Sequence, residues 1–356
     1  MPTKTPHIGF WISNSKPERL PTLVRARFMV AAAYQVPFFA FCSRDVDLER
    51  QKIQGTFFED GAYVKRETDF PQYIDLRLGT GIHKKNRTIT EALKTKGTFI
   101  PNASIGTKDQ INQKLLQDET HCKYAIPSYT WYPNLDISAI VDHYGTIILK
   151  PKNGSNGRGI YKITNTSPNY YEIHYLTEKT PMTRGQLLHN VQALDLKNYM
   201  IQQYINSSTQ EGTPFDIRLN VACGLDGTYK ITSFYARYGA GGYVGTNMGK
   251  AEKTQSVNVK GSLIYQFGEK EGKRLYEEII SLSQTFPVYF ASTKKILLPE
   301  LAMDIGVCRD SKQLYLFEVG VSPGTTVVVP YEIAEQNVGY YKYLIEEKNH
   351  DENQLV

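Results

Sequence analysis

The sequence predicts an α/β domain at its N-terminal end, followed by a mixed region that becomes rich in β-structure after about residue 199. Two observations predict it. Over the first hundred residues, short apolar runs alternate with a segment of helical spacing, as expected for a parallel sheet with crossover helices. Beyond residue 199, β-branched and apolar runs follow one another, with the hairpin dipeptide Asp226-Gly227 between two of them. A chain of 356 residues has room for two or three domains.

The first domain is expected to end near residue 100. Apolar runs predict strands at residues 7–12 and 36–41, and the spacing of Leu23, Phe28 and Ala31 predicts a helix over residues 21–34 between them. The remaining elements expected here are strands at 56–64 and 73–76 and a helix at 88–96.

The second region, residues 101–198, is expected to begin with a helix capped by Thr107 and ending near Leu116. Strands are expected after it at 126–131, 146–150, 159–163 and 170–175, with helices at 136–141 and 183–191. The third region, residues 199–356, should hold strands at 199–205, 217–223 and 230–237, a helix at 272–285, a hairpin of 298–307 and 313–319, and a closing helix at 340–347.

Composition excludes several classes of protein. The chain has 41 Lys and Arg against 36 Asp and Glu, and a net charge of +5 is too small to indicate nucleic acid as a partner. The four Cys form no CxxC and no zinc-ligand spacing with His, which predicts free thiols in a reducing compartment. The N-terminus has no apolar signal-peptide core, and the most apolar stretch, residues 28–42, is too short and interrupted to span a bilayer. We therefore expect a cytoplasmic protein with no membrane partner.

A glycine-rich loop between two β-branched runs is the most informative segment. Gly154, Gly157 and Gly159 allow close backbone approach, and successive backbone N–H groups in such a turn bind anions. No acid occurs between residues 143 and 171, whereas the loop is surrounded by four cations: Lys150, Lys152, Arg158 and Lys162. We interpret it as a phosphate-binding loop, the alternative being a hairpin with a polar tip. It is neither a Walker A loop nor a dinucleotide fingerprint, because a strand follows it and not a helix.

Two acids near the C-terminus are candidate metal ligands. Asp304 and Glu318 fall on the two strands of the predicted hairpin, roughly opposite each other. Mg²⁺ prefers carboxylates together with substrate phosphates, and acids in apolar strands are costly to bury unless paired or metal-bound. A magnesium site is therefore expected, the alternative being a pair of solvent-facing acids.

Two arginines are candidate contacts for phosphate or carboxylate. Arg218 and Arg237 both fall on predicted strands, and an arginine fork suits either anion. The alternative is an ion pair with Asp216 or another acid. The glycine-rich stretch that contains Asn247 is a candidate loop for closing over a substrate.

Several short motifs occur in a fixed order between residues 108 and 324. They are Leu149-Lys-Pro, Gly154-Ser-Asn-Gly-Arg-Gly-Ile, Ile201-Gln-Gln-Tyr-Ile, Asp216-Ile-Arg, Arg237, Thr246-Asn, Asp304, and Phe317-Glu-Val-Gly with Pro323-Gly. Together they resemble the ATP-grasp superfamily and, within it, the YheC/YheD family of endospore coat-associated proteins. The resemblance implies a nucleotide clasped between two α+β subdomains, residues 101–198 and 199–356, after a small α/β pre-ATP-grasp domain, residues 1–100.

The resemblance also implies roles for individual residues. Lys108 and Lys150 look like the two lysines that reach the phosphates. Asp216 resembles the acid near the ribose, and Arg237 a contact to phosphate or acylphosphate. Arg218 and Asn247 are the further candidate catalytic residues. The loop residues that would cover the phosphates are Gly154, Ser155, Gly157 and Gly159, those that would read the adenine edge are Gln202, Gln203 and Ile205, and those that would bind magnesium are Asp304 and Glu318.

The function implied by the resemblance is a carboxylate–amine ligase that uses ATP and Mg²⁺ and acts through an acylphosphate on an unidentified carboxylate and amine. Relatives carry Glu-x-Asn at the last metal motif, whereas this chain has Glu318-Val319-Gly320, which leaves one side-chain oxygen absent. Two alternatives stay open. One is a catalytically weak or inactive structural or interaction protein of the spore coat, with coat proteins as partners. The other is a small-molecule phosphotransferase that uses the same site.

Overall fold

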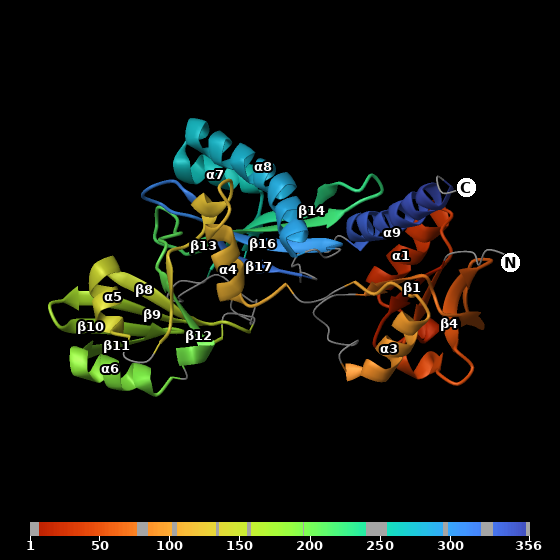
Figure 1. Ribbon diagram of the computed structural model, residues 1–356. Helices are drawn as coiled ribbons and strands as arrows, with labels where there is room; N and C mark the ends of the chain where they lie inside the picture. The colour runs from red at the N-terminus through yellow and green to blue at the C-terminus, as the bar shows by residue number, and fades with distance from the viewer. Residues whose placement is uncertain are drawn as a thin grey trace.

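The computed structural model describes residues 7–76, 85–101, 105–132, 135–154, 158–194, 196–239, 255–294, 298–321 and 330–353. Three sheets organise these residues. The sheet of the N-terminal residues lies at one end of the molecule, the sheet containing β8 and β12 lies at the other, and the sheet containing β13 and β16 lies between them (Figure 1).

The N-terminal sheet has the predicted parallel core. β1 (Ile8–Trp11) lies between β2 (Phe38–Phe41) and β6 (Tyr73–Leu76) and is parallel to both, with α1 (Thr22–Ala33) as the crossover. The strand predicted at 56–64 is wrong. That segment spans a hairpin, because Asp60 and Gly61 both have positive φ, as a tight hairpin turn requires. The other elements are β3 (Val46–Asp47), β4 (Lys52–Glu59), β5 (Ala62–Asp69) and α3 (Arg87–Thr95).

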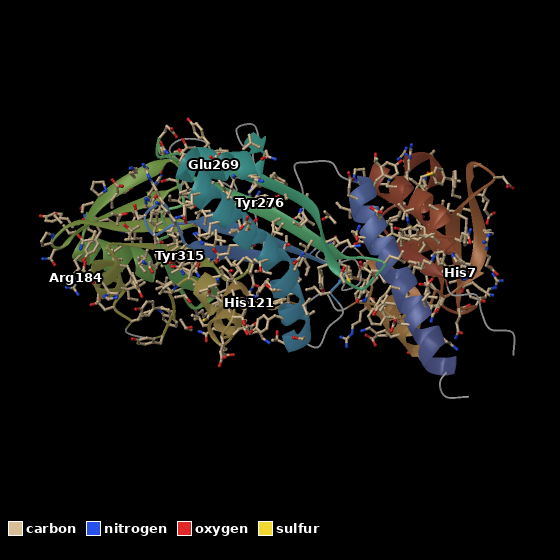
Figure 2. The ribbon with its side chains drawn as sticks, turned by 90° about the horizontal axis from the view of Figure 1, so that it is seen from above. His7, His121, Arg184, Glu269, Tyr276 and Tyr315 are labelled. Carbon is tan, nitrogen blue, oxygen red and sulfur yellow. The ribbon has the colours of Figure 1, made fainter. Side chains whose placement is uncertain are left out.

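The last helix packs on the first sheet. α9 (Pro330–Asn353) is much longer than the helix predicted at 340–347, and its Val338 and Tyr341 join the hydrophobic core that contains Ile8 and Phe10. The Tyr341 hydroxyl donates to the carbonyl of Ile74 at 3.0 Å. Figure 2 shows α9 lying along this part of the molecule. The two ends of the described chain therefore share one core.

The second sheet, which contains β8 and β12, is antiparallel throughout, in the order β11-β10-β9-β8-β12-β7. Ile147, Leu149 and Ile201 pack into a core with α5 and α6, so that the alternate residues Lys150 and Gln202 face the other side. Its elements are β7 (Ser128–Thr130), α5 (Ile137–Tyr144), β8 (Thr146–Pro151), β9 (Tyr161–Ser167), β10 (Tyr170–Tyr175), β11 (Glu178–Thr183), α6 (Arg184–Gln192) and β12 (Tyr199–Gln203). The helix that precedes them, α4 (Lys108–Leu116), packs Ile111 and Leu115 into the core of the third sheet.

The third sheet has the strand order β15-β14-β13-β16-β17. Alternate residues such as Leu219 and Met303 form a core with the two helices that follow β15, and the other face carries polar side chains. The elements are β13 (Phe215–Cys223), β14 (Tyr229–Tyr238), β15 (Gln255–Val257), α7 (Val259–Phe267), α8 (Glu269–Lys294), β16 (Glu300–Val307) and β17 (Leu314–Gly320). No helix in the described ranges is long and apolar enough to cross a membrane.

Candidate functional site

The polar face of the third sheet places the predicted acids side by side. Asp304 on β16 is the register partner of Glu318 on β17 and of Arg218 on β13. The three side chains therefore form a row across neighbouring strands, and the predicted pairing of Asp304 with Glu318 is confirmed. Arg218 Nε lies 2.9 Å from Asp304 Oδ1, although neither atom has a well-aligned hydrogen bond within the described ranges.

Arg237 is held by two carboxylates on the same face. Its Nε and Nη2 donate to the two carboxylate oxygens of Asp216 at 2.6 Å each, and Nη2 lies 3.0 Å from Asp304 Oδ1. Burial by itself lowers the pKa of Arg237, but the carboxylates of Asp304 and Asp216 outweigh this and raise the pKa. Arg237 is therefore a fixed positive charge, and the ion pair considered as the alternative from sequence is formed. The ribose contact of Asp216 and the phosphate contact of Arg237 stay predictions.

Two lysines from the second region, residues 101–198, approach Glu318. Lys108, the first residue of α4, donates from Nζ to the carbonyl of Gly154 at 2.8 Å and lies 3.4 Å from Glu318 Oε1. Lys150, near the end of β8, donates to the carbonyl of Phe317 at 2.9 Å. Burial lowers the pKa of Lys150 to about 8, and the negative charge of Glu318 partly opposes that shift. Two lysines from residues 101–198 thus lie beside Glu318 of the third sheet.

These side chains line a common pocket. Lys108, Lys150, Gln202 and Glu318 contribute to its wall. The pocket has a volume of only about 20 Å³, enough for a single water, so it is closed in this structure. The sequence analysis did not predict the six other lining residues, which are Ile111, Asn112, Leu115, Leu316, Phe317 and Val319.

Two of these six residues, Asn112 and Phe317, make polar contacts at the site. Asn112 donates to the carbonyl of Ile126 at 3.0 Å and to Ser128 Oγ at 2.8 Å, which fixes α4 beside β7. Its spacing of four residues from Lys108 places both on one side of the helix, and that spacing was the available signal. Phe317 acts through its backbone carbonyl, for which the side-chain pattern holds no signal.

The glycine-rich loop begins against α4. The Lys108 backbone N–H donates to the carbonyl of Lys152 at 3.2 Å, and Lys152 Nζ lies 3.3 Å from Asp109. Gly154 and Gly159 have φ of +134° and +74°, which only glycine adopts readily. Ser155, Gly157 and Asn247 lie outside the described residues. Gln203 and Ile205 lie at and just beyond the end of β12 and are absent from the pocket wall.

The arrangement of these motifs has a counterpart among known proteins. The model of the "YheC/D like ATP-grasp" family matches residues 97–347. This chain belongs to the YheC/D-like ATP-grasp family. The predicted ATP-grasp fold is therefore confirmed.

Members of the family are related to the chain along most of its length. The endospore coat-associated protein YheD of Bacillus subtilis (strain 168) is 19% identical over 342 residues, covering 90% of this chain and 72% of YheD. YheC of the same organism is 21% identical over 305 residues, covering 83% and 82%. Among solved structures, D-alanine–D-alanine ligase from Bacillus anthracis is 11% identical, with a TM-score of 0.47 and coverage of 97% and 99%.

The side chains present in this YheC/D-like protein suit a magnesium ion that is also bound by nucleotide phosphates. Within the described ranges there is no cluster of three or more His, Cys, Asp or Glu that could hold a metal by itself. Asp304 and Glu318 provide two carboxylates, and Mg²⁺ typically takes one or two in addition to phosphate oxygens and water. Asp304 Oδ1 already lies 2.9 Å from Arg218 Nε and 3.0 Å from Arg237 Nη2, so a magnesium ion would share this carboxylate with the two guanidinium groups.

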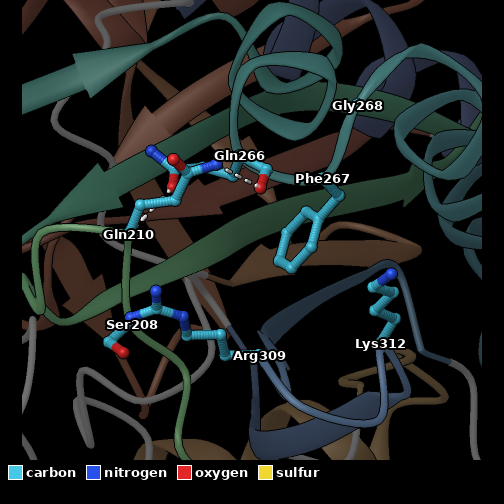
Figure 3. Close-up of a pocket in the computed structure, with 7 residues that line it drawn as sticks. All are labelled: Ser208, Gln210, Gln266, Phe267, Gly268, Arg309 and Lys312. Atoms are coloured by element: carbon cyan, nitrogen blue, oxygen red, sulfur yellow. Dashed lines mark hydrogen bonds between the residues drawn. The ribbon is translucent and has the colours of Figure 1, made fainter.

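A second pocket, of about 410 Å³, is separate from this site (Figure 3). Arg309 in the β16–β17 turn donates to the carbonyl of Thr209, and the Gln210 N–H donates to Gln266 Oε1, both at 3.0 Å. These bonds tie the hairpin turn and α7 to the segment that follows β12. None of the residues predicted from sequence lines this pocket.

Proposed function

We propose that this protein binds ATP with Mg²⁺ and acts as a carboxylate–amine ligase through an acylphosphate. The observation that supports the proposal is the convergence of Lys108, Lys150 and Glu318, which come from three elements far apart in sequence. Membership of an ATP-grasp family supports the same conclusion. ATP entry requires the second sheet, with β8 and β12, to move away from β17, because the pocket between them is closed.

The proposed reaction has two steps. A carboxylate oxygen of the acceptor attacks the γ-phosphorus of ATP, the bond to the β,γ-bridging oxygen breaks, and ADP leaves. The amine then attacks the acyl carbon, loses a proton, and displaces phosphate. Lys108 and Lys150 would bind phosphate oxygens, and Arg218 and Arg237 would hold positive charge beside Asp304. Magnesium, bound by Asp304 and Glu318, would neutralise phosphate charge.

Calorimetry with ATP and Mg²⁺ tests the binding part of the proposal. We expect the wild type to bind, and Lys150→Ala to bind at least tenfold more weakly, because a charge-assisted contact to phosphate is lost. Lys179→Ala is the matched control, since Lys179 is an exposed lysine of the same domain paired with Glu172. Absence of ATP binding in the wild type would refute the proposal.

ADP release in the presence of candidate carboxylates and amines tests turnover. Glu318→Gln should abolish it, because the variant keeps the size of the side chain and removes the charge. Unchanged ADP release in this variant would remove Glu318 from the site.

A second candidate function is a structural role in the spore coat with little turnover, through association with coat proteins. It is favoured by Gly320, where the side chain that relatives use as a ligand is missing, and by the similarity to coat-associated YheD and YheC. ATP binding without ADP release, across a wide panel of acceptors, would support it. Transfer of phosphate to an acceptor as a stable product would indicate a phosphotransferase. We propose a cytoplasmic location, from which association with the coat is possible.

A further inference from the structure

A second row of residues lies beside the acidic row of the third sheet. Asn220 on β13 pairs with Ala302 on β16, which pairs with Gly320 on β17. On each strand this row is two residues away from the row of Arg218, Asp304 and Glu318. Because side chains two apart on a strand point to the same side, both rows face the nucleotide pocket side of the sheet.

The second row has little side-chain volume on two of its three strands. Ala302 carries one methyl group, and a Cβ built at Gly320 would meet no atom of the described residues within 4 Å. Asn220 is thus the one residue in this row with a polar side chain, and it stands next to the row that holds Asp304.

The side-chain amide of Asn220 uses its nitrogen in a hydrogen bond but not its oxygen. The residue is 1% exposed, and its Nδ2 donates to Ser233 Oγ at 2.6 Å. Its Oδ1 is buried and accepts no hydrogen bond within the described ranges. Leaving a buried acceptor unpaired costs about 1–3 kcal/mol, so such an atom calls for an explanation. Asp304 Oδ1, on the neighbouring strand and the same face, is by contrast ion-paired with the guanidinium groups of Arg218 and Arg237.

Asn220 Oδ1 thus has unused electron pairs on the same face as the carboxylates of Asp304 and Glu318, where a bound cation would use them. Mg²⁺ and Mn²⁺ bind through carboxylate, amide and water oxygens. We propose that Asn220 supplies an amide oxygen to the cation bound by Asp304 and Glu318. The oxygen thus comes from β13 in place of the side chain that is absent at Gly320. This inference rests on the proposed function only for the presence of a cation at these two acids.

Binding of Mn²⁺ measured by the loss of the free-ion EPR signal tests the proposal, with and without ATP. Asn220→Ala should weaken Mn²⁺ binding at least about tenfold, because removal of a group that only orients a metal ligand already costs about 10–100-fold in affinity. Asn220→Asp keeps an oxygen in place and should bind Mn²⁺ at least as well as the wild type. Thr232→Val is the control, since Thr232 Oγ1 contacts the backbone carbonyl of Asn220 and not its side chain.

A double variant tests whether an amide at position 320 can replace the amide of Asn220. Adding Gly320→Asn to Asn220→Ala places an amide on the same face in open space beside Glu318, so Mn²⁺ affinity should return toward the wild-type value. Wild-type affinity in Asn220→Ala would overturn the inference. So would equal losses in Asn220→Ala and Asn220→Asp, which would mean that the amide acts as a donor.

Failure of the proposed function gives a different result. A wild type that binds Mn²⁺ but no ATP refutes the ATP-dependent function and leaves the Asn220 comparison intact. A wild type that binds no Mn²⁺, with or without ATP, overturns the inference itself. Thermal unfolding of each variant shows whether it is folded, and Asn220→Asp keeps the comparison available if Asn220→Ala is not.

Discussion

Raising the pH above 8 should weaken ATP binding through Lys150. Burial lowers the pKa of this lysine from 10.5 to about 8 in the folded protein, with Glu318 opposing the shift. Only the protonated amine attracts phosphate. With a pKa of about 8, roughly nine-tenths of the amine is charged at pH 7 and roughly one-tenth at pH 9, so the apparent Kd for ATP should rise about tenfold.

Stability should change in the opposite direction. Because the folded pKa of Lys150 lies below the unfolded one, the unfolded chain binds more protons between about pH 8 and 10.5. Lys150 therefore raises the free energy of unfolding, and so stabilises the folded state, as the pH rises through that range. Weaker ATP binding at pH 9 would then not result from loss of the folded state.

Calorimetric titration with ATP at pH 7, 8 and 9, at constant ionic strength, measures the effect. Lys150→Arg is the control, because a guanidinium stays charged over this range and should give a Kd that is much less sensitive to pH. The same Kd at pH 7 and 9 in the wild type would refute the reasoning, as would an equal pH-dependent loss in Lys150→Arg.

Three further substitutions test packing, two of them at the site and one in the core that α9 shares with the first sheet. Gly306→Ala should destabilise by about 1–3 kcal/mol in urea unfolding, because its Cβ would lie 2.0 Å from the ring of Phe317; an unchanged midpoint would contradict the packing. Asp216→Asn should cost about 3–5 kcal/mol in the same assay, since it leaves the buried Arg237 without its bidentate partner, and a loss below 1 kcal/mol would argue against that pair. Val338→Ala should cost about 2 kcal/mol and speed hydrogen exchange in β1 and β6, whereas faster exchange confined to α9 would contradict a shared core.

The acidic pair was predictable because local information determines it. The turn at residues 309–312 fixes the register of the hairpin, and the apolar neighbours of Asp304 and Glu318 fix the face on which each acid lies. The cap of α4 was predictable for the same reason, since Thr107 and Gln110 form a capping box within four residues.

Features that depend on contacts between residues far apart in sequence could not be predicted. Two acids compete for Arg237, and only the pairing of β13 with β14 and β16 brings both to it. Asn220 has no distinguishing neighbours in sequence, because its place beside Asp304 depends on the register of different strands. The edge strand β11 was missed because Pro181 lies within it, which a sheet tolerates only at its edge.

The position of α9 has a consequence for synthesis of the chain. The first sheet leaves the ribosome early together with α1, but α1 covers only part of its hydrophobic face, and the rest stays uncovered until Val338 and Tyr341 emerge. A nascent chain that stops before α9 would expose the part of this core that Val338 and Tyr341 cover to water or to other chains. The N-terminal hundred residues produced alone should therefore aggregate, and adding α9 as a separate peptide should restore their solubility.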